Sequence, residues 1–527
     1  MKMKKLLLVV VMAGLAMTSF GQNVVWKKNF GGSFRDYYQS VTAVSDGIVA
    51  VGASNGWSFG GGDWEGVQVN GNNAYYDAII VKYDNYGNVA WKKNFGGSSS
   101  DTFQGVTKVS DGIIAVGYSW AFGDGDWTGV TGNGNGDAII VKFDNNGNVV
   151  WKKNFGGSGD DRYFSVTTVS DGIIAVGTSE YGSFGTGDWV GVTGKKDNDA
   201  IIVKYDFNGN VLWKNNYGTP ALDIFYSVTA VSDGVIAVGY MSYRMYMGTI
   251  QPDDAIIVKF DNAGNLVWDK TLEGSALDDY YGITTVSDGV IAVGYSDSGS
   301  FDNGVWAGIA GKGSYDAIAV KYDNDGNVLW KKNFGGSRND DFECITTMSD
   351  GFIVAGFSYV NNTGDWTGIT GKGSPDAILV KYDFNGNVQW KNTFGGAGDN
   401  EYHSLAVVSD GIVAVGEANS FGAYDLVDVT GNGDADAIIV KYGFSNTDIP
   451  ELQQQAGITV SPSPATDFVT VSGLQGNETL YFYNINGQLL ITRKAASAAE
   501  TVPVGNLPSG IYLLKTGDGQ TVKWVKH

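Results

Sequence analysis

The sequence predicts an all-β chain in which a seven-bladed β-propeller, closed by an N-terminal strand, is followed by a small C-terminal β-sandwich. Three observations support this prediction. A repeat of 55 to 65 residues runs through most of the chain, each repeat holds four strand signals, and the array begins with a strand that its last repeat lacks. Glycine (77 residues) and aromatic residues (13%) are abundant and proline is scarce (8 residues), which is typical of short strands joined by tight turns.

Each repeat has the pattern of one four-stranded antiparallel sheet. Within residues 165–215, an Asp-Gly turn joins the first two strand signals and an Asn-Gly-Asn turn joins the last two. The four strand signals are residues 165–171, 173–177, 199–206 and 211–215. Asp-Gly and Asn-Gly tolerate the positive φ angles that tight hairpins need. Four antiparallel strands in a repeat of this length predict the blade of a propeller.

A tryptophan marks the fourth strand of each repeat, and we expect it to pack between blades. The series is Trp26, Trp91, Trp151, Trp213, Trp268, Trp330 and Trp390. The third strand begins at Asp77, Asp137, Asp199, Asp254, Asp316, Asp376 and Asp436. The last copy has no fourth strand after it, whereas residues 23–30 form a fourth strand with no repeat before it. Pairing the two closes a ring and leaves no open sheet edge, whereas a solenoid would need capping repeats.

These repeats resemble the seven-bladed β-propeller repeats of bacterial secreted proteins. The resemblance lies in the pattern DAIIVKYDxxGNVxWKKNFGGSxxDxxxxVTxVSDGIIAVGYS and covers residues 23–442. It implies the fold of residues 22–442 but no particular function, because propellers include both binding proteins and enzymes.

Charge and the N-terminal segment indicate an exported protein. The formal net charge of −21 at pH 7 opposes binding to nucleic acid and to anionic lipid surfaces. Residues 1–21 combine a basic start, an apolar run and a small-x-small exit, which is typical of a signal peptide. The alternative is a membrane anchor, but an apolar run of about 12 residues is short for a bilayer. No membrane span is predicted in the mature protein, and the single cysteine, Cys344, excludes an intrachain disulfide.

Function is expected on the face that carries the long loops between second and third strands, because the tight turns leave the opposite face flat. Five of these loops hold a tryptophan, usually as Gly-Asp-Trp. The ligand-binding candidates are Asp63, Trp64, Asp126, Trp127, Asp188, Trp189, Trp306, Asp365 and Trp366. An exposed indole beside a carboxylate could stack on a sugar while the acid binds its hydroxyls. Alternatively, each indole packs its own loop as a local core.

One acidic residue per repeat falls at or near the same register before the first strand. The series is Asp36, Asp101, Asp161, Asp223, Asp279, Asp341 and Glu401. Such a ring could bind a cation such as calcium, or each carboxylate could accept backbone hydrogen bonds in its own loop. Sevenfold recurrence favours the structural role. No cofactor and no metal site is predicted, and calcium is left as a candidate only.

The sequence carries no common zinc-binding or phosphate-binding motif. Neither His403 nor His527 has a histidine or cysteine partner near it in the sequence, and Gly-Lys-[Ser/Thr] and His-Glu-x-x-His motifs are absent. We expect His403 in the loop before the first strand of the last repeat, with a packing or surface role, and Cys344 as a small buried thiol. The chain is predicted not to be an enzyme, although a glycosidase needs only two carboxylates.

Beyond Tyr442 the repeat stops, residues 443–457 form a polar linker, and residues 458–527 predict a small β-sandwich. This last unit resembles the C-terminal sorting domain of type IX secretion substrates. The residues that carry the resemblance are Pro462, Pro464, Ala465 to Asp467, Asn486 to Gln488, Leu507 to Tyr512 with Gly510, and Lys523 to Lys526. The resemblance implies Sec export, recognition by the type IX machinery, removal of this domain, and release or attachment at the cell surface.

Three functions remain open at this point. The first is a secreted or cell-surface binding or adhesion module for a glycan or a protein. The second is a secreted carbohydrate-active enzyme that uses a carboxylate pair on the loop face, with the irregular fourth and seventh repeats as the place to look. The third is a structural surface-layer component that has no discrete ligand.

Overall fold

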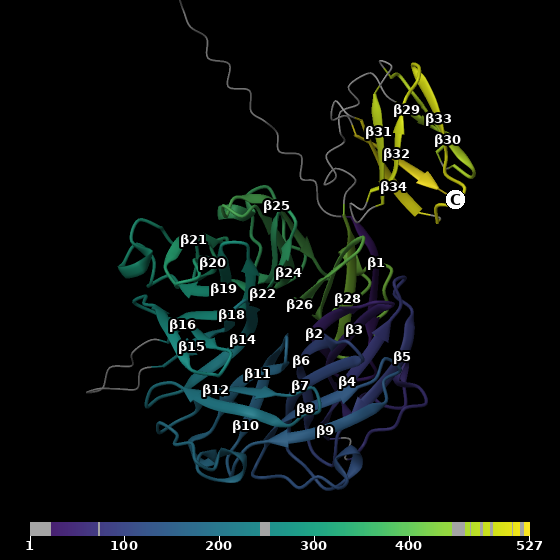
Figure 1. Ribbon diagram of the computed structural model, residues 1–527. Helices are drawn as coiled ribbons and strands as arrows, with labels where there is room; N and C mark the ends of the chain where they lie inside the picture. The colour runs from purple at the N-terminus through teal and green to yellow at the C-terminus, as the bar shows by residue number, and fades with distance from the viewer. Residues whose placement is uncertain are drawn as a thin grey trace, which may run out of the picture. The chain divides into compact units, whose positions relative to one another are not determined.

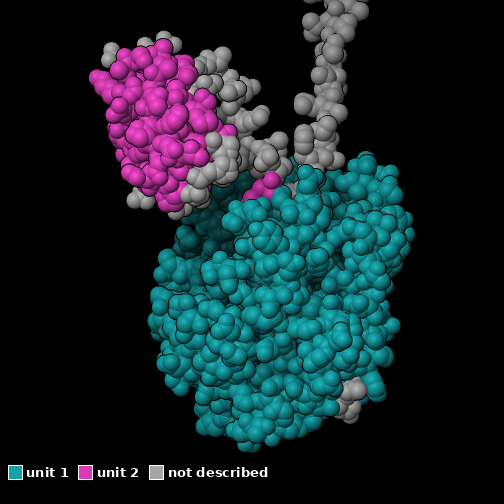
Figure 2. Space-filling view, turned by 90° about the vertical axis from the view of Figure 1, so that its right-hand side faces the viewer, with its two compact units in different colours: residues 1–443 teal, residues 444–527 magenta. Residues whose placement is uncertain are grey.

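The computed structural model describes residues 23–71, 74–242, 253–444 and, within 459–526, all except 464, 475–477, 485–488, 509 and 517–520. The predicted signal peptide (1–21), most of the predicted linker, and Pro464 lie outside the described residues. The chain forms two compact units, residues 1–443 and 444–527 (Figure 2). Among the described residues, no helix has both the length and the apolar character needed to cross a bilayer.

Seven four-stranded antiparallel sheets, the blades, make up the first unit (Figure 1). Blade 1 consists of β2 (Asp36–Val44), β3 (Gly47–Asn55), β4 (Tyr76–Tyr83) and β5 (Val89–Phe95). Blade 2 consists of β6 (Asp101–Val109), β7 (Gly112–Ser119), β8 (Asp137–Phe143) and β9 (Val149–Phe155). Blade 3 consists of β10 (Asp161–Val169), β11 (Gly172–Ser179), β12 (Asp199–Tyr205) and β13 (Val211–Tyr217). Blade 4 consists of β14 (Asp223–Val231), β15 (Gly234–Met241), β16 (Asp254–Asp261) and β17 (Leu266–Leu272). Blade 5 consists of β18 (Asp278–Val286), β19 (Gly289–Asp297), β20 (Tyr315–Tyr322) and β21 (Val328–Phe334). Blade 6 consists of β22 (Asp340–Met348), β23 (Gly351–Ser358), β24 (Asp376–Tyr382) and β25 (Val388–Phe394). Blade 7 consists of β26 (Asn400–Val408), β27 (Gly411–Ala418) and β28 (Asp436–Gly443), with β1 (Val24–Phe30) as its fourth strand.

Short 3-10 turns lie in the loops between second and third strands. They are η1 (Gly56–Ser58), η2 (Gly62–Trp64), η3 (Gly125–Trp127), η4 (Tyr181–Ser183), η5 (Gly187–Trp189), η6 (Gly304–Trp306), η7 (Gly364–Trp366) and η8 (Tyr424–Leu426). The Gly-Asp-Trp segments fold as such turns because their first glycine adopts a positive φ, +55° at Gly62 and +47° at Gly187, which side chains disfavour.

Ring closure occurs where the ends of the repeat array predicted it. Strand β1 pairs antiparallel with β28, with Trp26 opposite Lys441 and Phe30 opposite Ala437. Blade 7 is therefore built from both ends of the array. The seven-bladed fold with an N-terminal closing strand is confirmed.

The first strand of each blade lies nearest the ring axis. These seven strands, the inner strands, are β2, β6, β10, β14, β18, β22 and β26 (Figure 1). Each contacts the inner strands of both neighbouring blades, so together they surround a central channel. The core lies between adjacent blades; for example, Val49 and Ile80 of blade 1 pack with Phe103 and Trp127 of blade 2.

The fourth-strand tryptophans pack between blades, as expected. The Trp26 ring covers the turn between β4 and β5, where a Cβ on Gly87 would lie 2.8 Å from the indole, and its Nε1–H donates to the Asn85 carbonyl at 3.2 Å. Trp390 differs, since its buried Nε1 has no partner among the described residues. The physical reason is the split blade 7, because β28 and β1 are not joined by the turn that accepts this bond elsewhere.

The second unit is a sandwich of two small sheets, as predicted. One sheet holds β29 (Thr459–Ser461), β30 (Phe468–Ser472) and β33 (Ala499–Pro503); the other holds β31 (Thr479–Asn484), β32 (Leu489–Lys494), β34 (Gly510–Thr516) and β35 (Thr521–Lys526). Val471 from the first sheet and Phe482, Leu514 and Trp524 from the second share one core.

Candidate functional site

The tryptophans proposed to stack on sugars are buried. Trp64, Trp127, Trp189, Trp306 and Trp366 are all 0% exposed. Trp189, for example, packs edge-on against Phe155 and against Phe184 of its own loop. Because no ring face is open to a ligand, the burial contradicts the stacking interpretation, and the alternative of a local loop core describes these residues.

In four of these five blades the inward-pointing indole donates to a buried aspartate, whereas Trp306 Nε1 has no partner among the described residues. In blade 3, Trp189 Nε1 lies 3.0 Å from both Asp161 Oδ1 and Ser179 Oγ. The corresponding residues in four other blades are Asp36, Ser54 and Trp64; Asp101, Ser119 and Trp127; Asp278, Ser296 and Trp306; Asp340, Ser358 and Trp366. Where the tryptophan is absent, the serine is absent too. Blade 4 has Met241 there but keeps Asp223, and blade 7 has Ala418 with Leu426 and Asn400. The serine and the tryptophan therefore vary together, and in blade 7 the aspartate changes with them.

The aspartates of the Gly-Asp-Trp segments connect neighbouring blades. Asp188 Oδ2 accepts from the Gly156 backbone N–H at 3.1 Å and from Asn133 Nδ2 of the preceding blade at 2.8 Å. The other aspartates are held in the same way: Asp63 by Gly31 and Asn432, Asp126 by Gly96 and Asn70, Asp365 by Gly335 and Lys312. One carboxylate oxygen of each aspartate is therefore used within the fold, which favours a structural role for these residues.

The sevenfold acidic register is also structural, and three of the seven acids predicted at or near it lie one residue away from it. Asp161 begins its inner strand, is 0% exposed, and accepts from the Gly157 N–H at 2.9 Å. In blades 5 to 7 the residues in this role are Asp278, Asp340 and Asn400, not Asp279, Asp341 and Glu401, which lie one residue later. Adjacent strand residues point to opposite sides, so these three have different surroundings from the register.

Burial affects the ionisation of the register aspartates. Burial raises the pKa of Asp161 to about 6, against hydrogen bonds from Ser179, Gly157, Ser183 and Trp189 that lower it. Burial likewise raises the pKa of Asp101 to about 7 and that of Asp223 to about 8. An ionised carboxylate without a cation partner is costly at such depth.

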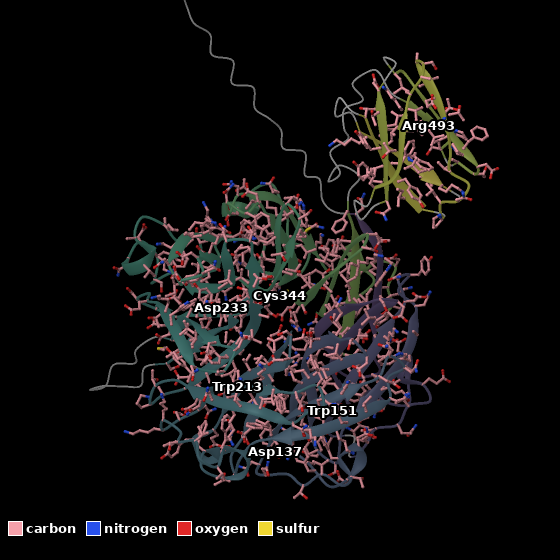
Figure 3. All side chains as sticks on the ribbon, in the orientation of Figure 1. Asp137, Trp151, Trp213, Asp233, Cys344 and Arg493 are labelled. Carbon is pink, nitrogen blue, oxygen red and sulfur yellow. The ribbon has the colours of Figure 1, made fainter. Side chains whose placement is uncertain are left out.

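The central channel is lined by a different residue in nearly every blade. The fourth residue of each inner strand faces it: Gln39, Gln104, Phe164, Tyr226, Tyr281, Glu343 and His403. The residue before each of these is always aromatic and 0% exposed: Tyr38, Phe103, Tyr163, Phe225, Tyr280, Phe342 and Tyr402. The lined space has a volume of about 550 Å³. Cys344, which was expected to be buried, is half-buried beside this channel on β22 (Figure 3).

A second hollow of about 620 Å³, the mouth hollow, lies at the loop face of the channel and shares Gln39 and His403 with it. Its rim carries aromatic rings that are open to solvent, Tyr75 (43% exposed) and Trp120 (40% exposed). The Arg162 guanidinium lies 4.9 Å from the Tyr118 ring and 5.6 Å from the Trp120 ring.

Charged groups complete the wall of the mouth hollow. Arg35 binds Glu417 through two hydrogen bonds of 2.8 and 2.5 Å, and the hydrogen bond to Glu417 is the main reason why the pKa of Arg35 is raised. The predicted loop face therefore does contain a hollow, but the residues that line it were not among the predicted site residues. Trp120 and Tyr75 do not recur from repeat to repeat, and a search for shared positions overlooks them.

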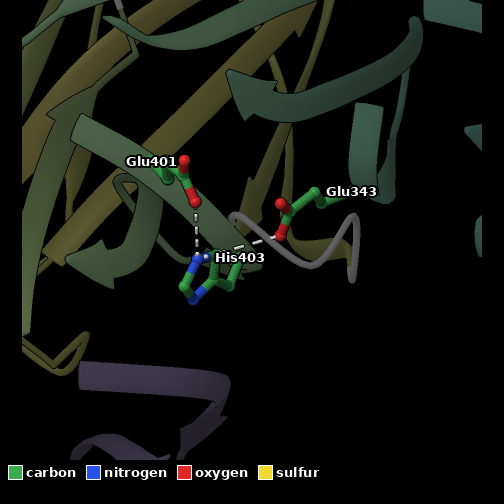
Figure 4. Close-up of side chains that lie close together, drawn as sticks. All are labelled: Glu343, Glu401 and His403. Atoms are coloured by element: carbon green, nitrogen blue, oxygen red, sulfur yellow. Dashed lines mark ion pairs between the residues drawn. The ribbon is translucent and has the colours of Figure 1, made fainter. Parts of the chain in front are cut away.

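One cluster of charged side chains stands on the channel wall. Glu343 of β22 and Glu401 and His403 of β26 point toward one another (Figure 4). His403 Nε2 lies 3.5 Å from Glu401 Oε2 and 3.9 Å from Glu343 Oε2, and Nδ1 lies 3.0 Å from the Tyr38 carbonyl oxygen. His403 is thus part of an inner strand. The sequence analysis had placed it in the preceding loop, and that expectation was wrong.

The cluster shifts the pKa values of its own members. Burial alone would lower the pKa of His403, but Glu343, Glu401 and Glu417 raise it to about 9. Burial raises the pKa of Glu343 to about 7, and His403 opposes that rise. Burial, with the neighbouring Glu343, Asp279 and Glu401, raises the pKa of Asp341 well above its ordinary value.

The predicted sorting-signal residues lie in the second unit. Gly510 begins β34 and pairs with Lys526 at the end of β35. The Tyr512 hydroxyl donates to the Pro508 carbonyl at 2.7 Å, and its ring stacks on Trp524 at 5.0 Å. Pro462 is exposed just after β29. The described members thus occupy strand ends and the sandwich core.

The C-terminal residues match a known protein family. Residues 459–527 match the family described as "Secretion system C-terminal sorting domain". Over 186 residues the chain is 24% identical to "Regulatory protein FlaEY" of Caulobacter vibrioides. That match covers 34% of this chain and 19% of that protein, so the chain spans about a fifth of the relative's length.

Solved structures with similar folds include propellers. PorZ, described as an essential bacterial surface component of the type-IX secretion system of Porphyromonas gingivalis, is 14% identical with a TM-score of 0.39, covering 94% of this chain and 60% of that one. The WD40 β-propeller domain of Doa1 is 11% identical with a TM-score of 0.40, covering 79% of this chain and 97% of that one. The blade count and the ring closure rest on the strand pairing given above.

The sorting-domain match confirms the prediction made for the last 70 or so residues. It also confirms the predicted destination outside the cell or on its surface. The chain is therefore an exported seven-bladed β-propeller that ends in a type IX secretion C-terminal sorting domain.

Proposed function

We propose that the propeller is a secreted or cell-surface binding module, not an enzyme, and that it binds a glycan in the mouth hollow. The observation that carries this proposal is the exposed ring of Trp120 at the rim of a polar cavity of about 620 Å³. Export by residues 1–21 and the Sec pathway, followed by handling through the type IX machinery, forms part of the same proposal.

The chemistry of the hollow fits a sugar better than an apolar ligand. Aromatic faces pack on the C–H faces of a pyranose, and Tyr75 and Trp120 offer such faces. Amide, guanidinium and carboxylate groups supply hydrogen bonds to hydroxyls, and Gln39, Arg162 and Glu401 line the same space. The volume lies within the range of small-ligand pockets.

A glycan array probed with the mature full-length chain tests this proposal. Trp120→Ala should abolish the strongest signals, because it removes the stacking surface. Trp57→Ala is the matched control, since Trp57 is 55% exposed on the same face but does not line the hollow. Equal binding by both variants and the unmodified protein, or no saturable glycan binding at all, would exclude the mouth hollow as the site.

A glycoside hydrolase is the second candidate, because two channel carboxylates, Glu343 and Glu401, lie close together. A retaining glycosidase needs carboxyl groups about 5 Å apart. His403 lies between these two carboxylates, however, and contacts both, which disfavours separate acid and nucleophile roles. Release of sugars from polysaccharides by the purified chain, abolished in Glu401→Gln, would decide for this candidate.

A further inference from the structure

The cluster of Glu343, Glu401 and His403 has the composition of a metal site. One donor atom from each residue lies within 4.8 Å of the others (Figure 4). Ligands bonded to one Zn²⁺ at about 2.0–2.2 Å lie at most about 4.4 Å apart. The two separations measured from His403 Nε2, 3.5 Å to Glu401 and 3.9 Å to Glu343, fall within that limit, so one ion could contact all three side chains with little movement.

The histidine is already oriented for such a role. Its Nδ1 lies 3.0 Å from the Tyr38 carbonyl oxygen, which can only accept a hydrogen bond. The Nδ1 atom therefore carries a proton, and Nε2 is directed toward the two glutamates. Histidine ligands of metal ions commonly donate their second ring N–H to a carbonyl in this way.

One oxygen of a nearby buried carboxylate has no hydrogen-bond partner among the described residues. Asp341 lines the same channel wall as Glu343 and His403, is 8% exposed, and its Oδ1 has no hydrogen-bond partner among the described residues. Arg35, a guanidinium in this part of the molecule, is bound to Glu417. Burying an uncompensated carboxylate is costly, and a bound cation would supply the missing positive charge.

The cluster also occurs only once around the ring. Unlike the register aspartates, it has no equivalent in the other blades, where Gln39, Gln104, Phe164, Tyr226 and Tyr281 take the place of His403. A role in blade packing would be expected to recur with the blade. The single occurrence therefore favours a site.

We propose that Glu343, Glu401 and His403 bind one divalent transition-metal ion on the channel wall, next to the Asp341 carboxylate. An imidazole nitrogen combined with carboxylate oxygens suits Zn²⁺ or Mn²⁺, whereas Ca²⁺ prefers oxygen ligands alone. The expectation that the sequence holds no metal site came from ligand spacing along the chain. Here the ligands come from strands in two neighbouring blades. This proposal does not depend on glycan binding.

Titration calorimetry of the full chain, produced without a polyhistidine tag and stripped with a chelator, tests it with ZnCl₂. We expect a single equivalent to bind, and roughly tenfold or greater loss of affinity in His403→Gln and in Glu343→Gln. Three controls should bind as the unmodified chain does: Asp160→Asn removes a carboxylate that pairs with Arg162, Cys344→Ser removes the only thiol, and His527→Ala removes the other histidine.

A measurement on the unmodified chain keeps the proposal open to refutation if a variant misfolds. X-ray absorption of the Zn²⁺-loaded chain should show one imidazole, oxygen ligands and no sulfur. A sulfur ligand, no saturable binding, affinity unchanged in correctly folded His403→Gln, or Ca²⁺ binding as tight as Zn²⁺ binding would each overturn the proposal. Thermal unfolding of each variant, compared with the unmodified chain, identifies the folded ones.

Discussion

Two adjacent positions of the inner strands face different surroundings, and they vary differently. Toward the blade core, the third residue is a fully buried aromatic ring in all seven blades, from Tyr38 to Tyr402. Toward the channel, the next residue is Gln, Phe, Tyr, Glu or His, depending on the blade. Close packing constrains the first position in every blade alike. The second position is free of that constraint, so its variety marks where the molecule is specialised.

Variation within the core occurs in matched sets. Hydroxyl groups of paired tyrosines meet at 2.6 to 2.8 Å: Tyr38 and Tyr83, Tyr163 and Tyr205, Tyr280 and Tyr322, Tyr402 and Tyr442. Two blades replace both members by phenylalanine: Phe103 and Phe143, Phe225 and Phe260. Blade 6 alone is mismatched, since Phe342 faces Tyr382, whose buried hydroxyl has no partner among the described residues.

The largest expected loss of stability comes from replacing a buried loop tryptophan in the core between blades. Trp189→Ala should lower the free energy of unfolding by about 3–5 kcal/mol, because it leaves a cavity and removes the donor to Asp161 and Ser179. Chemical denaturation of the full chain, followed by intrinsic fluorescence, measures the loss.

Blade 7 supplies the compensating design for this experiment. Trp189→Leu combined with Asp161→Asn and Ser179→Ala copies its Leu426, Asn400 and Ala418. This triple variant should be more stable than Trp189→Leu alone. If the two were equally stable, the three residues would not form one packing unit.

Mismatching a tyrosine pair should have the next largest effect. Tyr205→Phe leaves the Tyr163 hydroxyl buried without a partner, which should cost about 1–3 kcal/mol of unfolding free energy. The double variant Tyr163→Phe with Tyr205→Phe, which copies blade 2, should recover most of that loss. Urea midpoints of the three proteins give the comparison.

Blade 6 predicts the opposite sign. Tyr382→Phe removes a hydroxyl that has no partner in the described part of the chain, so it should leave the free energy of unfolding unchanged or raise it by about 1 kcal/mol. A destabilisation as large as that of Tyr205→Phe would contradict the matched-set interpretation.

A smaller effect is expected from pH. Burial raises the pKa of the register aspartates, for example to about 6 for Asp161, about 7 for Asp101 and about 8 for Asp223. A group whose pKa is higher folded than unfolded contributes stability below its unfolded pKa, and that contribution is lost as pH rises through the folded pKa. Stability should therefore increase as pH falls from 8 to 5, as these buried carboxylates take up protons.

Thermal unfolding in buffers across that window tests this sign. The turn aspartates Asp84 and Asp144 have a lowered pKa because of hydrogen bonds from Asn88 and Asn148, so they titrate below the window and do not mask the effect. A midpoint that falls steadily between pH 8 and pH 5 would show that the register aspartates do not behave as buried acids.

The same contrast explains how far the sequence could lead. Repeat spacing and turn chemistry predicted the blades, and the orphan strand 23–30 predicted the ring closure, because these features reflect packing that all blades share. Strand and turn patterns in the last residues likewise predicted the sandwich. Exposure of Trp189 could not be predicted, since a tryptophan in a glycine-rich loop gives the same pattern whether its ring faces solvent or the core. Its partners, Asp161 and Ser179, lie on other strands.

Pairs of adjacent acidic residues explain why the register could be predicted only to within one residue. In Asp278-Asp279 and Asp340-Asp341 either residue can occupy the structural register, and only the strand's facing decides which one does. One signal for the channel was present nonetheless. Aligned inner strands contain an aromatic column followed by a variable column that holds Glu343 and His403, and this column is the channel wall.

The smallest expected change in stability sharpens the comparison most, because it concerns neighbouring residues on one strand. Gln39 lines both the channel and the mouth hollow and is half-buried, whereas Tyr38 is 0% exposed. Gln39→Ala should alter the free energy of unfolding by less than about 0.5 kcal/mol, against about 3–5 kcal/mol for Tyr38→Ala. If denaturation gave both variants a similar loss, the channel side would be as constrained as the core, and its variety would no longer indicate a binding surface.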